Sequence, residues 1–152
     1  MQRFAALVAG LWAGLLLGIG AVAAPLAFAT LARADAARLV NRVFMTEAYV
    51  SLAVAMLLFM FERRRTRDAA EAGVGSHVSG NLILLLGTLF CTVGGYFAIQ
   101  PMLEAARAGE ARWSFGTLHA VSSTLFVLKG LLVIVLAWRF APIRPSATST
   151  TS

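Results

Sequence analysis

Four side chains that could do chemistry lie inside stretches that are otherwise apolar. Glu47 lies in one apolar run, and His119, Ser122 and Lys129 lie in another, within "FGTLHAVSSTLFVLKG" at residues 115–130. Ionisable groups inside a membrane-spanning segment are costly, and they usually mark a functional site or a specific partner. A carboxylate, an imidazole and an ammonium group could bind a metal ion, carry protons or hold helices together. Which of these roles the groups have depends on how the helices position them.

The composition is that of an integral membrane protein. The chain has 152 residues, of which 59% are hydrophobic and 13% are charged, whereas an average soluble domain has about 45–50% and 25%. The apolar excess lies in runs of about 20 residues, the length needed to cross a bilayer. Most arginines flank these runs, where side chains meet lipid headgroups. The net charge of +6 therefore indicates a lipid bilayer as partner and no nucleic acid.

The apolar runs predict an all-α, four-helix transmembrane bundle that forms one domain over residues 1–140. Backbone polar groups inside a bilayer must be satisfied within the chain, so helices are expected in place of open sheet. Pro101 is expected to end the third span. The predicted spans are about residues 4–31, 43–61, 81–100 and 115–138, with a short interfacial helix at 35–41 and a disordered tail at 141–152.

The charge distribution predicts that both termini are cytoplasmic. With four spans, the N-terminus, the connection between the second and third spans, and the tail share one side. That side carries seven arginines, including the block "ERRRTR" directly after the second span, and the other side carries five. Cytoplasmic segments are enriched in Lys and Arg. Arginine outnumbers lysine twelve to one, which is typical of a bacterial gene of high GC content, so we expect a multi-pass protein of the bacterial inner membrane.

Three glycines on the first span predict close helix packing. Gly10, Gly14 and Gly18 recur every four residues, and small residues at this spacing let two helix backbones approach closely. We expect them to pack against another helix of the same chain. Homodimerisation is the alternative.

The spacing of the polar residues predicts one cluster near the outer face. The second and fourth spans enter the membrane from the same side. If they begin at Val43 and Phe115, Glu47 and His119 both lie four residues, about 6 Å, inside the membrane. Lys129 lies about 15 Å deeper than His119, so its ammonium group is expected to snorkel to the cytoplasmic interface. The predicted intramembrane polar cluster consists of Glu47, His119, Ser122, Gln100 and Pro25.

The residues available restrict the cofactors. Cys91 is the single cysteine, which excludes an intrachain disulfide and a CxxC motif. Zinc needs three or four ligands, and only Glu47 and His119 are expected to converge. Two axial haem histidines would need equal depth, which His77 in a cytoplasmic loop cannot supply. No cofactor is predicted, although haem or copper at His119 and Glu47 stays open. No catalytic residue is predicted either, because no Ser–His–Asp set, phosphate loop or acid dyad is visible.

The chain also resembles a known family. The resemblance rests on "APLAFATLARADAARLVNRVF" from the end of the first span onwards, on "EAYVSLA", and on "FGTLHAVSS". These segments are similar to those of the small four-span membrane proteins related to transmembrane protein 205, also catalogued as domain of unknown function 4149. The resemblance implies a single four-helix membrane domain with no settled activity. It highlights Pro25, Phe28, Phe44, Glu47, Phe115, His119 and Ser122.

Two functions follow from these observations. The first is a non-enzymatic accessory or assembly factor, acting as a homo-oligomer or with a membrane protein partner, in which the polar cluster holds helices together. The second is a metal-ion or haem-binding membrane protein that uses His119 and Glu47. A weaker likeness to membrane modules of the copper-resistance D type implies this second function, but the chain has one intramembrane histidine where those modules have more.

Overall fold

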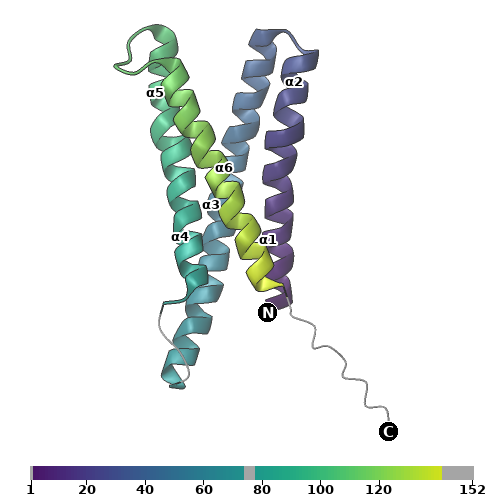
Figure 1. The fold of residues 1–152 in the computed structure, drawn as a ribbon, viewed down its shortest axis with the longest axis vertical. Coiled ribbons are helices and arrows are strands. Elements are labelled where there is room, and N and C mark those ends of the chain that lie inside the picture. The colour runs from purple at the N-terminus through teal and green to yellow at the C-terminus, as the bar shows by residue number, and fades with distance from the viewer. Residues whose placement is uncertain (1, 74–77, 142–152) are drawn as a thin grey trace.

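The computed structural model describes residues 2–73 and 78–141 and shows a bundle of four long helices (Figure 1). Each helix is long and apolar enough to cross a membrane, and the described ranges contain no strand. The expected all-α bundle is confirmed, and the chain is a multi-pass membrane protein. The predicted disordered tail lies outside the described residues except for Ala141. The helices cover Gln2–Thr30, Arg33–Glu71, Gly80–Ala108 and Phe115–Phe140.

The first and third spans each contain a π-helical segment between two α-helical parts. The bundle has a loop end, where residues 31–32 and 109–114 connect the helices, and a terminal end, where Gln2 and Phe140 lie (Figure 1). The elements in chain order are α1 (Gln2–Leu17), η1 (Gly18–Ala23), α2 (Ala24–Thr30), α3 (Arg33–Glu71), α4 (Gly80–Thr92), η2 (Val93–Ala98), α5 (Ile99–Ala108) and α6 (Phe115–Phe140).

The two π-helical segments let both spans continue past a proline. In a regular α-helix, a proline ring clashes with the carbonyl group four residues before it. For Pro25 and Pro101 these carbonyls belong to Ala21 and Phe97, which lie within η1 and η2, where i→i+5 bonding replaces the regular pattern. The prediction that Pro101 ends the third span is therefore wrong, since this span runs to Ala108.

The second span, α3, extends beyond the predicted limits at both ends. It is one helix of 39 residues from Arg33 to Glu71, so the segment predicted as a separate interfacial helix is its first part. That segment contains no glycine or proline that would interrupt a helix, and Asp35 in the first turn favours the helix N-terminus. The second span thus begins ten residues before the predicted start at Val43.

Serine side chains fix where the third and fourth spans begin. Ser79 accepts a hydrogen bond from the backbone N–H of Leu82, and Ser114 accepts one from Thr117. Each serine satisfies one of the free N–H groups at a helix N-terminus. The third span ends at Ala108 and is capped by Gly109, whose φ of 78° is a left-handed conformation that glycine adopts without steric cost.

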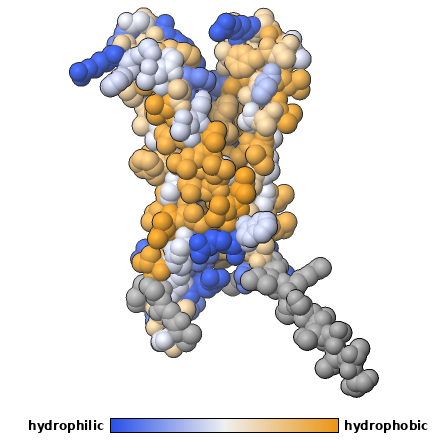
Figure 2. Space-filling view, viewed as in Figure 1, coloured by the Kyte–Doolittle hydropathy of each residue, from blue (hydrophilic) through white to orange (hydrophobic). Residues whose placement is uncertain are grey.

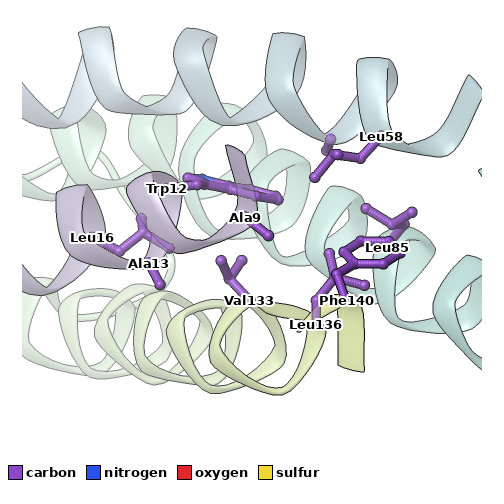
Figure 3. Close-up of a cluster of buried hydrophobic side chains, with 10 residues drawn as sticks. Ala9, Trp12, Ala13, Leu16, Leu58, Leu85, Val133, Leu136 and Phe140 are labelled. Carbon is purple, nitrogen blue, oxygen red and sulfur yellow. The ribbon is translucent and has the colours of Figure 1, made fainter. Parts of the chain in front are cut away.

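The main hydrophobic core lies in the terminal half of the bundle (Figure 3). There α1 packs most extensively against α6, and α4 packs against both α3 and α6. Towards the loop end, the α2–α3 hairpin and the α5–α6 hairpin diverge (Figure 1), and a smaller cluster of Ile99, Leu103 and Leu118 joins α5 to α6. On the face seen in Figure 2, the middle of the bundle is mostly hydrophobic, as expected of a surface that lipid covers.

Among the described residues, no other helix packs against the glycine repeat of the first span. Gly10, Gly14 and Gly18 are all exposed, and a Cβ added at any of them would meet no atom within 4 Å. The predicted intrachain contact is therefore wrong. Buried Ala9 and Ala13, each one residue before a glycine, belong to the main core with residues of α6 (Figure 3), and the glycines face outward.

Candidate functional site

Glu47 on α3 and Lys129 on α6 form an ion pair inside the bundle. The Nζ atom of Lys129 donates to Oε1 of Glu47 at 2.7 Å and to Oε2 at 2.9 Å. Both residues are only 3% exposed. Removing an isolated charge from water is costly, and only a close partner with good hydrogen-bond geometry offsets that cost. The structure supplies this partner to each charge.

Ser51 and Trp12 extend the ion pair to a third helix. Ser51, one turn after Glu47 on α3, donates its hydroxyl to Oε1 of the carboxylate. Trp12 on α1 donates its indole N–H to the Ser51 Oγ atom at 2.8 Å. On α6, the ring centroid of Phe126 lies 5.1 Å from the Lys129 Nζ atom, within the range of a cation–π contact. We call Trp12, Ser51, Glu47 and Lys129 the ion-pair network; it connects α1, α3 and α6.

Two predictions about the charged residues are wrong for one geometric reason. The convergence of Glu47 with His119 and the snorkelling of Lys129 both depend on a second span that begins at Val43. Because α3 begins at Arg33, Glu47 is the fourteenth residue after its start, about 21 Å along the helix. Lys129 is likewise the fourteenth residue after the start of α6, so these two residues share a depth.

His119 lies at the loop end and not in the ion-pair network. It is exposed and lies ten residues, about 15 Å, nearer the loop end than Lys129. Its ring stacks on that of Phe115, with centroids 5.7 Å apart and planes 6° apart. The guanidinium carbon of Arg107 lies 5.0 Å from the centroid of the same phenylalanine ring. His119 is therefore part of an exposed stack of a cation and two rings.

The other three residues of the predicted cluster lie in separate places. The Ser122 hydroxyl donates to the Gly95 carbonyl in η2 at 2.8 Å, so it joins α6 to the third span. The Gln100 side chain donates to Oδ1 of Asn41 on α3 at 2.5 Å. Pro25 lies in the first turn of α2. The structure thus replaces the single predicted cluster with several distinct contacts between helices.

The structure contains a second buried carboxylate, Glu62, which the sequence does not predict as a site residue. It is 3% exposed and accepts hydrogen bonds from Ser79 at 2.8 Å and from Asn81 at 3.2 Å. Arg65, one turn further along α3, lies 3.5 Å from it. Because Glu62 opens the block "ERRRTR", it reads as a surface charge. In the structure it connects α3 to the beginning of α4.

Glu47 and His119, the two candidate metal ligands, do not converge, since Glu47 pairs with Lys129 and His119 stacks on Phe115. Among residues 2–73 and 78–141, no group of three His, Cys, Asp or Glu side chains lies close enough to hold one. Both oxygens of Glu47 already accept hydrogen bonds from Lys129. His77 lies outside the described residues. What the ion-pair network can do is neutralise two charges within the membrane and fix three helices relative to one another.

Comparison with known proteins identifies a family. No curated protein and no solved structure matches the chain. Residues 7–112 match the family described as a domain of unknown function (DUF4149). The match includes Trp12, Glu47 and Ser51 and ends before α6, which carries Lys129. Because it covers more than half of the 152 residues, the chain belongs to the DUF4149 family.

Proposed function

We propose that this protein is a non-enzymatic accessory or assembly factor of the inner membrane, akin to the proteins related to transmembrane protein 205. The observation that carries the proposal is the closed geometry of Glu47 and Lys129. Catalytic acids and bases must reach a proton on the substrate. Here both carboxylate oxygens are bonded to the ammonium group, and both residues are 3% exposed. This arrangement favours a structural role for the charges.

The ion pair acts across a gap between two helices. Within the described residues, no Cα atom of α3 lies within 8 Å of a Cα atom of α6. The long Lys129 side chain crosses this distance and reaches Glu47, and the rings of Phe44 and Phe126 make an edge contact beside it, with centroids 5.0 Å apart. The pair therefore fixes the separation of α3 and α6 where their backbones do not touch.

An accessory role is consistent with the surface of the protein. Gly10, Gly14 and Gly18 of the first span are exposed, and a Cβ at each would meet no atom within 4 Å. In membranes, small residues allow close approach of another helix. We therefore include a membrane protein partner in the proposal, with a second copy of this chain as the alternative partner.

The proposal places both termini in the cytoplasm. Four exposed arginines follow the hydrophobic part of α3 at the terminal end, namely Arg63, Arg64, Arg65 and Arg67. This concentration of positive charge supports the orientation, since cytoplasmic segments carry the excess of basic residues. Reporter fusions to the C-terminus that are active only in one compartment test it, and activity outside the cytoplasm would contradict it.

The test of the accessory role is a comparison of membrane proteomes. In the organism that carries the gene, deletion should lower the abundance or assembly of one or a few other membrane proteins. Wild-type protein and a folded Glu47→Leu/Lys129→Met double variant should both restore them, because the charges serve the fold. If deletion leaves every membrane complex intact, the accessory role is refuted. If the folded double variant fails to restore them, the ion pair itself carries activity.

A further inference from the structure

A groove of about 300 Å³ runs along the seam between the first span and α3. From the first span it is lined by Leu15 and Ile19, and from α3 by Arg42, Val43, Thr46 and Val50. Arg42 is the lining residue of α3 nearest the loop end, and Val50 is eight residues, about 12 Å, further along the helix. The groove is thus an elongated, mainly apolar slot with a cation at one end.

Arg42 lies where α3 enters its apolar segment. The residues after it, from Val43 to Phe61, form the uncharged hydrophobic part of the helix apart from the buried Glu47. Arg42 is exposed, and a long arginine side chain at the edge of an apolar segment extends its charged end to the lipid headgroups. The groove continues from this depth into the hydrocarbon region.

The charge of Arg42 is not used within the described part of the chain. No described carboxylate forms an ion pair with it, whereas Arg38, one turn nearer the loop end, pairs with Asp35. Glu47 also borders the groove, but its carboxylate is occupied by Lys129. The groove therefore presents one uncompensated positive charge at its headgroup end.

We propose that this groove binds an anionic phospholipid, with the phosphate on Arg42 and the upper part of one acyl chain between Leu15, Ile19 and Val50. A guanidinium group donates paired hydrogen bonds to phosphate oxygens. The apolar lining matches an acyl chain, and the cation selects the charge of the headgroup. This site does not depend on the proposed accessory role, since lipid could bind whether or not a protein partner does.

Native mass spectrometry of the full chain in detergent tests the site. Delipidated protein is mixed with equal amounts of dioleoyl phosphatidylglycerol and dioleoyl phosphatidylcholine, which differ in the charge of the headgroup. A basic residue near an anionic lipid contributes about 1 kcal/mol, so we expect about a fivefold preference for phosphatidylglycerol. Equal retention of the two lipids by wild-type protein would overturn the proposal.

Variants locate the preference on Arg42. Arg42→Gln should abolish it, Arg42→Lys should retain most of it, and the matched control Arg38→Gln should leave it unchanged. Both arginines lie on the exposed surface of α3, so thermal unfolding should be unaffected. An equal loss in Arg38→Gln and Arg42→Gln would mean that general surface charge attracts the lipid, and would refute the site.

A groove-filling variant tests the acyl chain separately from the headgroup. Thr46→Phe places a ring in the groove and should lower the retention of phosphatidylglycerol while Arg42 is intact. Glycerol 3-phosphate, which has the anionic group without acyl chains, should not displace the bound lipid. Unchanged retention in Thr46→Phe, or displacement by glycerol 3-phosphate, would show that the groove does not hold the chain.

Discussion

Glu47 and Lys129 lie the same number of residues from the loop-end starts of α3 and α6, and their side chains meet across a space that the two backbones leave open. Lys129 donates to both oxygens of Glu47, although no described Cα atoms of α3 and α6 come within 8 Å. The pair lies on the loop-end side of the main core, since Leu58 and Val133 of that core follow Glu47 and Lys129 along their helices. It therefore holds the bundle where the two hairpins begin to diverge.

Removing one partner of the ion pair should destabilise the fold strongly. Glu47→Leu leaves the Lys129 ammonium buried and unpaired, and breaking a buried pair in this way costs about 3–5 kcal/mol. We expect a large fall in the unfolding temperature of the detergent-purified protein. Tryptophan fluorescence measures this unfolding. Arg38→Gln removes an exposed charge from the same helix and is the control, with an expected change below about 1 kcal/mol. Equal effects of the two variants would argue against a structural pair.

Trp12 should contribute a smaller, separable amount. Trp12→Phe keeps an aromatic ring in the core and removes the N–H that donates to Ser51. The loss of one such hydrogen bond should cost about 1 kcal/mol, to which the smaller ring adds a packing loss. In a Ser51→Ala background the hydrogen-bond part of the cost should disappear. Thermal unfolding of the two single variants and the double variant measures this, and purely additive effects would contradict the contact.

Two glycines of the first span should respond differently to the same substitution. A Cβ at Gly20 would lie 2.9 Å from the Phe126 ring, whereas a Cβ at Gly14 would meet nothing within 4 Å. Gly20→Leu should therefore push α6 away and destabilise the protein by about 1–3 kcal/mol. Gly14→Leu should leave the unfolding of the isolated chain unchanged. Thermal unfolding of both variants decides this, and destabilisation by Gly14→Leu at a concentration where the protein is monomeric would contradict the outward orientation of that glycine.

His119 should be dispensable for folding and for metal content. It is exposed and contacts Phe115, so His119→Ala should change stability by less than about 0.5 kcal/mol, as surface substitutions usually do. Elemental analysis of wild-type and His119→Ala protein for iron, copper and zinc should give the same substoichiometric values. Stoichiometric metal in the wild type that disappears in the variant would contradict this prediction and support a metal-binding function.

The number and type of the spans could be predicted from the sequence because hydropathy acts over about 20 residues at a time. The ends of the spans could not, because hydropathy marks the hydrocarbon region and not the helix. The segment from Arg33 to Arg42 is polar yet helical. Because α3 begins ten residues before Val43, Glu47 lies about 15 Å further from the loop-end start of its helix than the sequence suggests, which brings it level with Lys129 and not with His119.

The sequence also could not predict which side of the first and third spans points into the bundle. Gly18 lies seven residues before Pro25, and Gly94 lies seven residues before Pro101. This shared spacing coincides with the two π-helical segments η1 and η2. A π-helical turn rotates the residues that follow it relative to a regular helix. Periodicity counted at a constant 100° therefore fails across η1 and η2. The outward direction of Gly10 is a different case, because a glycine repeat does not reveal which helix, if any, lies against it.

A double-mutant cycle on Glu47 and Lys129 tests the central claim most directly. Unfolding free energies are measured for wild type, Glu47→Leu, Lys129→Met and the double variant in the same detergent. A structural tie predicts that each single variant is strongly destabilised and that the double variant recovers most of the loss, since apolar replacement of a complete buried pair is often neutral or stabilising. Because each single loss is about 3–5 kcal/mol, the coupling energy should then exceed about 3 kcal/mol. Losses that simply add in the double variant would contradict the claim.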